Sequence, residues 1–183
     1  MTEQGMITLL DGDAMRRAIS RIAYEIIERV PDLDDLVLCG IKTRGAYLAK
    51  RLADKISEVE KREISWYEVD VSHFRDDRHR QSTEEVKSHA TLGHAFAQAI
   101  ENKTIILVDD VLFTGRTVRA ALDALTSTAR PSLIQLAVLI DRGHRELPIR
   151  PDYIGKNIPT AKSERVVVNM KEVDALDTVF LKK

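Results

Sequence analysis

One segment of the chain constrains its fold more than any other. Residues 105–108 are four consecutive apolar residues, Asp109 and Asp110 follow, and a loop ending in Thr-Gly-Arg-Thr leads into residues 117–127. In residues 117–127 apolar side chains recur at the three- and four-residue spacing of a helix that packs on one face. The segment therefore predicts a buried strand, a polar loop and a helix in direct succession. In open α/β sheets, ligands bind at such junctions, outside the carboxyl ends of strands.

The same alternation of apolar runs and amphipathic stretches continues along the chain. It predicts strands at 36–41, 64–71, 105–108, 133–140 and 166–168, and helices at 14–30, 45–56 and 117–127. Asp11 or Asp13 is a suitable N-cap for the first helix, and Pro31 marks its end. Strands that alternate with helices indicate an α/β fold, a mainly parallel twisted sheet flanked by helices. We expect one domain over residues 1–183.

Composition excludes several classes of protein. The net charge is −1, which gives no overall basic field for nucleic acid. No apolar run approaches the roughly 18 residues of a membrane span, and no secretory signal is visible, so we expect a cytoplasmic protein without a membrane partner. The single cysteine, Cys39, lies in an apolar run and is expected to be a buried, inert thiol.

Each residue type in the segment after residue 108 suits one part of a sugar phosphate. Amides at a helix N-terminus attract phosphate, and Gly115 allows the backbone to approach it closely. The hydroxyls of Thr114 and Thr117 are further donors. Asp109 and Asp110 can accept hydrogen bonds from vicinal ribose hydroxyls. An isolated Asp-Asp pair is more often a turn or a cap, but the attached strand and loop favour binding. The sequence contains neither a P-loop nor a dinucleotide glycine motif.

A second loop has the composition of a polyanion site. Residues 40–45, Gly-Ile-Lys-Thr-Arg-Gly, follow the first predicted α/β strand and precede a helix. Lys42 and Arg44 place cations beside exposed amides. Alone, the motif is most simply an ordinary loop with solvated charges. Two further stretches break the alternation: residues 72–90 are highly polar and predict a loop that closes as a lid, and residues 141–165 predict irregular structure.

These motifs resemble the signature of the type I phosphoribosyltransferases. The resemblance assigns ribose binding to Asp109 and Asp110, which would also be catalytic, and pyrophosphate binding to residues 42–44. In the lid, Arg75 is the residue expected to meet pyrophosphate charge during catalysis. The complete set expected for ribose and 5-phosphate is Asp109, Asp110, Val111, Leu112, Phe113, Thr114, Gly115, Arg116 and Thr117, and the pyrophosphate loop is Lys42, Thr43 and Arg44.

Over nearly its whole length the chain resembles the PyrR family of pyrimidine operon regulators. The resemblance rests on residues 15–23, 40–45, 141–150 and 153–160. It implies a uracil phosphoribosyltransferase that uses phosphoribosyl pyrophosphate with Mg²⁺, the ion being held through substrate and water without a direct protein ligand. It also implies regulation of pyrimidine genes by UMP-dependent binding to a leader mRNA. Residues 142–166 would form most of a small C-terminal hood over the base.

Particular residues carry these further roles. The resemblance implies base contacts from Arg142 and from the backbone at Val166, with Ile158 as a wall of the base pocket. The exposed face of the first helix and the basic segment 141–150 could instead be ordinary solvated surface, but a homodimer or larger assembly would join them, and we expect RNA contacts at Arg21, Arg29, His144, Arg145 and Arg150. Tyr24 stands where the family tends to carry a histidine, a departure that concerns RNA recognition and not catalysis. Two alternatives remain open: a purine phosphoribosyltransferase that uses hypoxanthine, and a regulator that senses nucleotides without catalysis.

Overall fold

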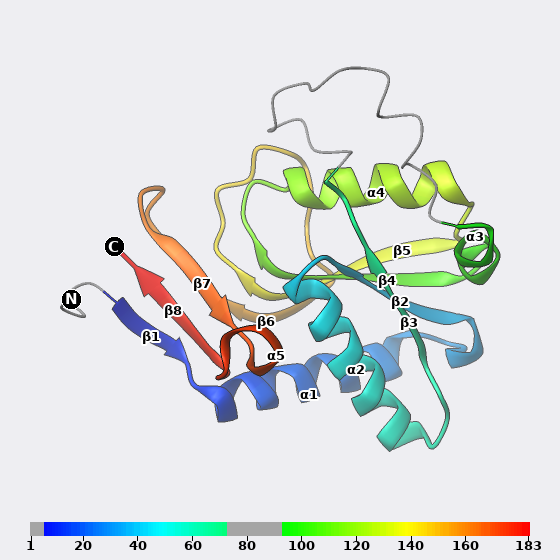
Figure 1. Ribbon diagram of the computed structural model, residues 1–183, viewed down its shortest axis with the longest axis horizontal. Coiled ribbons are helices and arrows are strands. Elements are labelled where there is room, and N and C mark those ends of the chain that lie inside the picture. Colours follow the sequence, from blue (N-terminus) through cyan, green and yellow to red (C-terminus); the bar gives the residue numbers. More distant parts are fainter. Residues whose placement is uncertain (1–5, 73–92) are drawn as a thin grey trace.

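A computed structural model describes residues 6–72 and 93–183, and its centre is a five-stranded sheet (Figure 1). The strands are β2 (Leu36–Ile41), β3 (Ser65–Val69), β4 (Thr104–Leu112), β5 (Leu133–Asp141) and β6 (Tyr153–Asn157). Their order is β3-β2-β4-β5-β6, and every neighbouring pair is parallel. The predicted α/β fold with a parallel sheet is confirmed.

Helices cover both faces of this sheet. On one face lie α1 (Gly12–Arg29) and α2 (Arg44–Glu60); on the other lie α3 (His94–Ile100) and α4 (Arg116–Thr128) (Figure 1). A 3₁₀ turn, Leu33–Asp35, leads into β2. Each face has its own apolar core. Asp11 is the N-cap of α1, where its carboxylate accepts a hydrogen bond from the amide of Ala14 at 2.7 Å, so the first of the two predicted caps is used.

The strand order places a switch point between β2 and β4. From β2 the chain crosses by α2 to β3 on one side, and from β4 it crosses by α4 to β5 on the other. Since crossover connections share one hand, opposite directions put α2 and α4 on opposite faces. The loops that follow β2 and β4 therefore diverge and leave a crevice at the carboxyl ends of the two strands, where open α/β sheets bind ligands.

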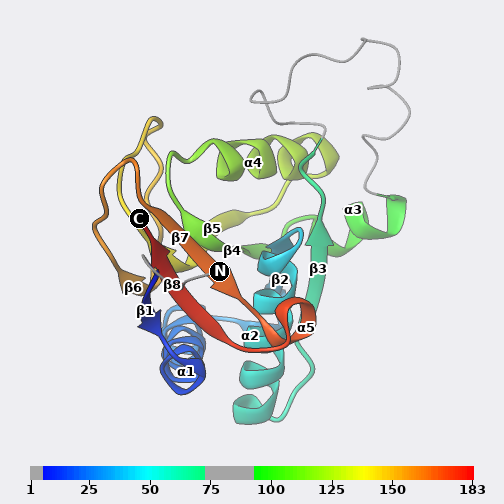
Figure 2. The ribbon, with the colours of Figure 1, turned by 60° about the vertical axis from the view of Figure 1, so that its left-hand side comes forward.

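A second, three-stranded sheet combines both ends of the chain. It consists of β1 (Met6–Leu10), β7 (Arg165–Asn169) and β8 (Thr178–Lys182), ordered β1-β8-β7 and antiparallel, with the one-turn helix α5 (Lys171–Asp174) between β7 and β8. Figure 2 shows this sheet beside the main one.

The extent expected for the hood differs from this topology. Residues 142–166 meet the second sheet only at 165 and 166, and 153–157 form β6 of the main sheet, in a stretch for which irregular structure was predicted. Residues 153–157 form a strand because they pair in parallel with β5 at the edge of the sheet. Gly155 lies so close to β5 that an added Cβ would stand 2.4 Å from the carbonyl oxygen of Leu139.

Other boundaries also moved. Strand β4 continues through Asp109 and Asp110 to Leu112, because its pairing with β5 persists to Asp141. Cys39 is fully buried in β2, and burial raises the pKa of its thiol to about 12, as expected of an inert strand cysteine. The expected lid, residues 72–90 with Arg75, lies outside the described residues except for Ser72.

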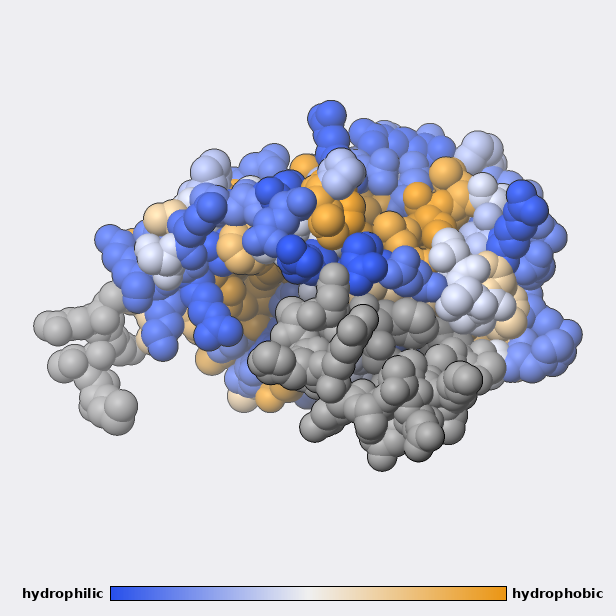
Figure 3. All heavy atoms as spheres, turned by 90° about the horizontal axis from the view of Figure 1, so that it is seen from above, coloured by the Kyte–Doolittle hydropathy of each residue, from blue (hydrophilic) through white to orange (hydrophobic). Residues whose placement is uncertain are grey.

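The surface of the protein is mainly hydrophilic on the face seen from above (Figure 3). Seen from above, hydrophilic residues dominate and apolar side chains appear in separate small areas (Figure 3). Among residues 6–72 and 93–183, every helix is too short or too polar to cross a membrane.

Candidate active site

The acidic pair stands at the end of β4 in the switch-point crevice. The amide of Asp110 donates to Oδ1 of Asp109 at 2.9 Å, and the amide of Val111 donates to Oδ1 of Asp110 at 2.8 Å. Burial raises the pKa of Asp110, and the amide of Val111 and the positive charge of Arg44 oppose that rise. Each carboxylate is thus oriented by the backbone, and Arg44 lies near enough to act on Asp110 electrostatically.

The loop after the pair forms a cavity of about 290 Å³ at the start of α4. Its lining residues come from β4, the loop and the first turn of α4, joined by one residue of the loop after β5; they are Asp109, Val111, Leu112, Phe113, Thr114, Gly115, Arg116, Thr117, Val118 and Glu146. All but one of the residues expected for ribose and phosphate therefore line one cavity; Asp110 is the exception. Gly115 is the N-cap of α4 with φ 93°, a left-handed conformation that favours glycine. Helix α4 is 13 residues long, and the amides of its first turn point toward the loop.

The loop after β5 holds residues 113–117, the predicted phosphate loop, in shape. The amides of Glu146 and Leu147 both donate to the carbonyl of Thr114, at 2.9 and 3.2 Å. Arg145 donates through Nη1 to the carbonyl of Phe113 at 3.0 Å. Glu146 also pairs with Arg116, Oε2 to Nε at 2.7 Å. Glu146 was not predicted, because its partner Arg116 lies 30 residues away and a single surface carboxylate has no distinguishing pattern.

The predicted pyrophosphate loop joins β2 to α2 across the crevice from β4. Lys42 pairs with Asp70 at 3.1 Å, with both side chains about half exposed, and the peptide between Lys42 and Thr43 is cis. Gly45 packs against β4: a Cβ there would stand 2.5 Å from the carbonyl oxygen of Val108, so only glycine allows α2 to start this close. The loops at 42–44 and 113–117 therefore follow the carboxyl ends of two adjacent parallel strands.

Arg142, the residue expected to contact the base, is buried and hydrogen-bonds to the segment before β7. Its Nε donates to the hydroxyl of Thr160 at 3.0 Å, and its Nη2 donates to the carbonyls of Ala161 and Glu164 at 3.1 and 2.7 Å. The guanidinium also lies 4.0 Å from the centroid of the Phe113 ring. Arg142 therefore ties the segment before β7 to the phosphate loop.

The two apolar residues expected at the base, Ile158 and Val166, are half-buried. Both pack against the core on the α1–α2 face. The amide of Ile158 donates to the carbonyl of Asp141 at 2.8 Å, which joins the end of β6 to the end of β5.

The expected RNA contacts fall into two groups. Arg21 donates to the carbonyls of Ile154 and Gly155, and Arg29 donates to that of Asp152 at 3.1 Å, so both lie along edge strand β6 with much of their side chains exposed. Arg150 is exposed as well.

His144 and Arg145 instead have internal partners. The Nε2 of His144 contacts the carbonyl of Thr160, and its ring meets that of Phe113 edge to face. Arg145 pairs with Asp141 at 2.6 Å and donates to the carbonyl of Ile149 at 2.9 Å. The structure thus separates surface cations from residues that support the phosphate loop.

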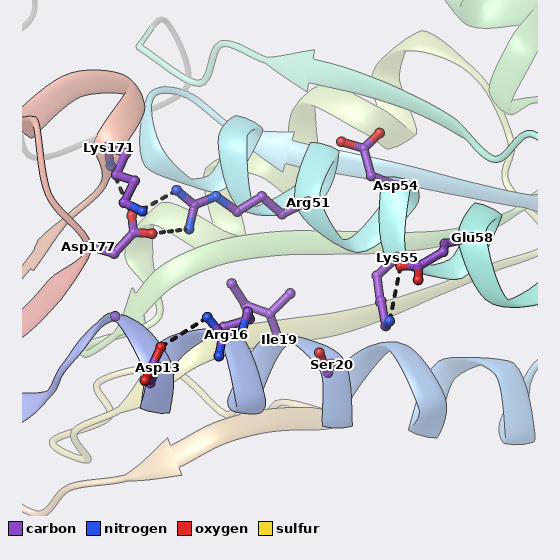
Figure 4. Close-up of a pocket in the computed structure, with 11 residues that line it drawn as sticks. Asp13, Arg16, Ile19, Ser20, Arg51, Asp54, Lys55, Glu58, Lys171 and Asp177 are labelled. Carbon is purple, nitrogen blue, oxygen red and sulfur yellow. Dashed lines mark hydrogen bonds and ion pairs between the residues drawn. The ribbon is translucent and has the colours of Figure 1, made fainter.

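A second cavity, of about 420 Å³, lies between α1, α2 and the turn at 171–177 (Figure 4). Its charged residues pair largely with one another: Asp13 with Arg16 at 2.9 Å, Lys55 with Glu58 at 3.0 Å, and Arg51 with Asp177 at 2.8 Å. Although this cavity is roomier, we place the candidate active site at the end of β4, because there the Asp109 carboxylate and the first turn of α4 line the same cavity.

Comparison with known proteins first gives the class. Residues 7–173 match the family described as phosphoribosyl transferase domain. Two solved structures share the fold: a hypoxanthine phosphoribosyltransferase from Staphylococcus aureus, with a TM-score of 0.67 and 20% identity, covering 97% of this chain and 92% of that one, and the hypoxanthine phosphoribosyltransferase of Trypanosoma cruzi, with a TM-score of 0.67 and 18% identity, covering 96% and 95%.

Closer relatives then give the family. The chain is 55% identical to the bifunctional protein PyrR of Ligilactobacillus salivarius, covering 96% of this chain and 97% of that one. It is 53% identical to the bifunctional protein PyrR of Bacillus subtilis, covering 94% of each. It is 51% identical to the pyrimidine operon regulatory protein of Lactococcus lactis, covering 96% of each. The chain belongs to the PyrR family of phosphoribosyltransferases.

Proposed function

We propose that this chain is a uracil phosphoribosyltransferase that joins uracil to the ribose of phosphoribosyl pyrophosphate and releases pyrophosphate. The observation that carries the proposal is the placement of an acidic pair and a phosphate loop at the end of β4, opposite a cationic loop at the end of β2. Membership of the PyrR family supports uracil as the base. The solved neighbours that use hypoxanthine share only about a fifth of the residues and support the fold alone.

The reaction displaces pyrophosphate from the anomeric carbon by a nitrogen of the base. In our proposal Asp109 and Asp110 accept hydrogen bonds from the two ribose hydroxyls, and the amides at the start of α4 bind the 5-phosphate together with Thr114 and Thr117. These contacts hold the sugar at both ends, so that the anomeric carbon is held in position for attack by the base nitrogen. Arg44 and Lys42 stabilise the negative charge that develops on the leaving pyrophosphate.

Mg²⁺ fits this arrangement as an ion that arrives with the substrate. The Asp109 and Asp110 carboxylates are hard oxygen donors of the kind that Mg²⁺ prefers. Burial raises the pKa of Asp110, and a nearby cation would oppose that rise because it favours the charged carboxylate. Held near Asp109 and Asp110 through substrate and water, the ion would neutralise charge on the leaving group.

We also propose that the chain regulates pyrimidine genes by binding a leader mRNA in a UMP-dependent manner, in the cytoplasm and as a homodimer or larger assembly. The exposed cations along β6, Arg21, Arg29 and Arg150, form the surface that supports this role. The carbonyl that accepts from Arg29 is that of Asp152, two residues beyond Arg150, so helix α1 and the 141–150 loop meet at one edge of the sheet. Arginine contacts phosphates and stacks on unpaired bases.

The catalytic proposal is tested by incubating the purified protein with phosphoribosyl pyrophosphate, Mg²⁺ and one base at a time, and measuring UMP, IMP or GMP. We expect UMP from uracil and little product from hypoxanthine or guanine. Preferential IMP formation would identify a purine enzyme, and no product with any base would leave a non-catalytic regulator.

The RNA proposal is tested separately by filter binding of pyrimidine-operon leader RNA at several salt concentrations, with and without UMP. Replacing Arg21 and Arg150 by Ala should lower the slope of log affinity against log salt by about 0.7–1 for each lost phosphate contact. Equal affinity of the wild type for a scrambled hairpin would refute specific recognition.

A further inference from the structure

Arg44, the arginine of the proposed pyrophosphate loop, is held by a carboxylate from the far end of the chain. Its Nη2 donates to both oxygens of Asp174, at 2.9 and 3.0 Å, and its Nε donates to Oδ2 at 3.3 Å. The two side chains are 32% and 21% exposed, so solvent screens the pair only in part. The contact joins the first turn of α2 to helix α5, across 130 residues of sequence.

Asp174 is itself fixed in place. Its Oδ2 accepts a hydrogen bond from the amide of Met170 at 3.0 Å, within its own turn. The same turn is anchored to α2 a second time, because Arg51 pairs with Glu172 at 2.6 Å and with Asp177 at 2.8 Å (Figure 4 shows the Asp177 pair). Arg44 and Arg51 are seven residues apart, which places them on one face of α2, two turns from each other.

The two arginines have different surroundings. Both edges of the Arg51 guanidinium are hydrogen-bonded to the turn: Nε and Nη2 donate to Glu172, and Nη1 and Nη2 donate to Asp177. Arg44 uses only the Nε–Nη2 edge, and its Nη1 makes no hydrogen bond to the part of the chain that the structure describes. Arg44 also begins the helix that follows β2, and β2 pairs in parallel with β4, the strand that carries the acidic pair.

We propose that Asp174 is a positioning residue for pyrophosphate: it grips one edge of the Arg44 guanidinium and presents the other edge to the substrate. The inference rests on the proposed function of the loop. A carboxylate anchored by its own turn is a fixed support, and an arginine already fixed loses little rotamer freedom when a ligand binds. That freedom corresponds to roughly a 10- to 30-fold factor in affinity.

An opposing effect has to be weighed against this one. The carboxylate of Asp174 repels a polyanion, and if repulsion dominated, removing its charge would strengthen binding. The carboxylate of Asp174 is paired with the Nε–Nη2 edge of Arg44, whose positive charge offsets its own, and Mg²⁺ that accompanies the pyrophosphate would reduce the repulsion further. The two effects have opposite signs and can be distinguished by one measurement.

The experiment is a calorimetric titration of the full chain with inorganic pyrophosphate plus Mg²⁺, with phosphoribosyl pyrophosphate, and with UMP. For Asp174→Asn we expect pyrophosphate and phosphoribosyl pyrophosphate to bind 5- to 20-fold more weakly, with UMP affinity unchanged, since UMP carries no pyrophosphate. In kinetics, KM for the activated sugar should rise more than kcat falls. Glu172→Gln is the matched control, from the same turn but paired with Arg51, and should leave pyrophosphate affinity unchanged.

A double-mutant cycle gives the decisive comparison. In an Arg44→Ala background, Asp174→Asn should cause no further loss, because the residue that it positions is gone. Unchanged or tighter pyrophosphate binding by Asp174→Asn would overturn the proposal, as would equal weakening of UMP, which indicates a damaged fold. Failure of the proposed function appears differently, as a wild-type protein that binds neither pyrophosphate nor phosphoribosyl pyrophosphate.

Discussion

Arg145 offers a direct test of whether a basic residue in the 141–150 loop supports the site or contacts RNA. Its guanidinium pairs with Asp141 at 2.6 Å and donates to the carbonyls of Phe113 and Ile149 at 3.0 and 2.9 Å. The side chains of Arg145 and Asp141 are 23% and 13% exposed. Replacing Arg145 by Ala would strand a largely buried carboxylate and free the phosphate loop at Phe113.

The magnitude follows from those contacts. Removing one partner of a buried ion pair costs about 3–5 kcal/mol, and residual solvent contact places this pair near the lower end, at about 3 kcal/mol. For a chain of this size each kcal/mol lowers the melting temperature by roughly 2–4 °C, so we expect a fall of roughly 6–12 °C. Affinity for phosphoribosyl pyrophosphate should fall as well, because the carbonyl of Phe113 loses its support.

The control is Arg150→Ala, from the same loop. Arg150 is exposed and has no hydrogen bond or ion pair to residues 6–72 or 93–183, so its removal should change stability by less than about 0.5 kcal/mol. Thermal unfolding and substrate titration of the two variants decide the question. If Arg145→Ala melts with the control, binds substrate normally and loses only RNA, the structural reasoning is wrong and Arg145 is a surface contact.

Three other outcomes are expected. Asp109→Asn and Asp110→Asn should each lower kcat/KM for the activated sugar roughly tenfold to a hundredfold, since a hydrogen bond to a charged acceptor is worth about 1.5–3 kcal/mol; wild-type rates in both would remove the ribose assignment. Because burial raises the pKa of Cys39 to about 12, its thiol should react with a disulfide reagent at pH 8 only as fast as the protein unfolds, and prompt reaction would contradict its burial. Burial raises the pKa of Asp177, but the hydrogen bonds from Arg51 and from the amide of Lys171, together with the positive charges of both residues, outweigh burial and lower the pKa. The stability gained is therefore present above the unfolded pKa of about 4 and is lost as pH falls through the folded pKa, so thermal unfolding from pH 7 to 3 should show a shallower acid loss in Asp177→Asn than in the wild type.

The sequence predicted the buried centre of the fold well, for a physical reason. Strands β2, β4 and β5 are covered on both faces, so their residues form continuous apolar runs that are easily seen. Strands β1 and β6 lie at sheet edges with several exposed positions, and neither was predicted. Their existence depends on partners far away in sequence: β1 pairs with β8, and β6 with β5.

The same distinction explains what was predicted of the site. The acidic pair, the loop and the start of α4 are consecutive, so their order alone indicated a cavity for a sugar phosphate. The support of that cavity is not consecutive. Glu146 reaches Arg116 from the next crossover, and Asp174 reaches Arg44 from the C-terminal turn. A sequence shows such residues as ordinary surface acids until folding brings their partners together.

The two cations of the β2–α2 loop differ in a way that explains why position 44 carries arginine. Lys42 carries a point charge on a flexible side chain. Its ion pair with Asp70 is weak because both side chains are about half exposed, so the ammonium can move to a ligand at little cost. Arg44 is planar and presents separate edges, so one edge can be fixed by Asp174 while the other stays available. A lysine at position 44 would have to give up the carboxylate to reach pyrophosphate. The geometry of guanidinium therefore allows one residue to be both anchored and ready to bind, and it links the pyrophosphate loop to a turn at the opposite end of the chain.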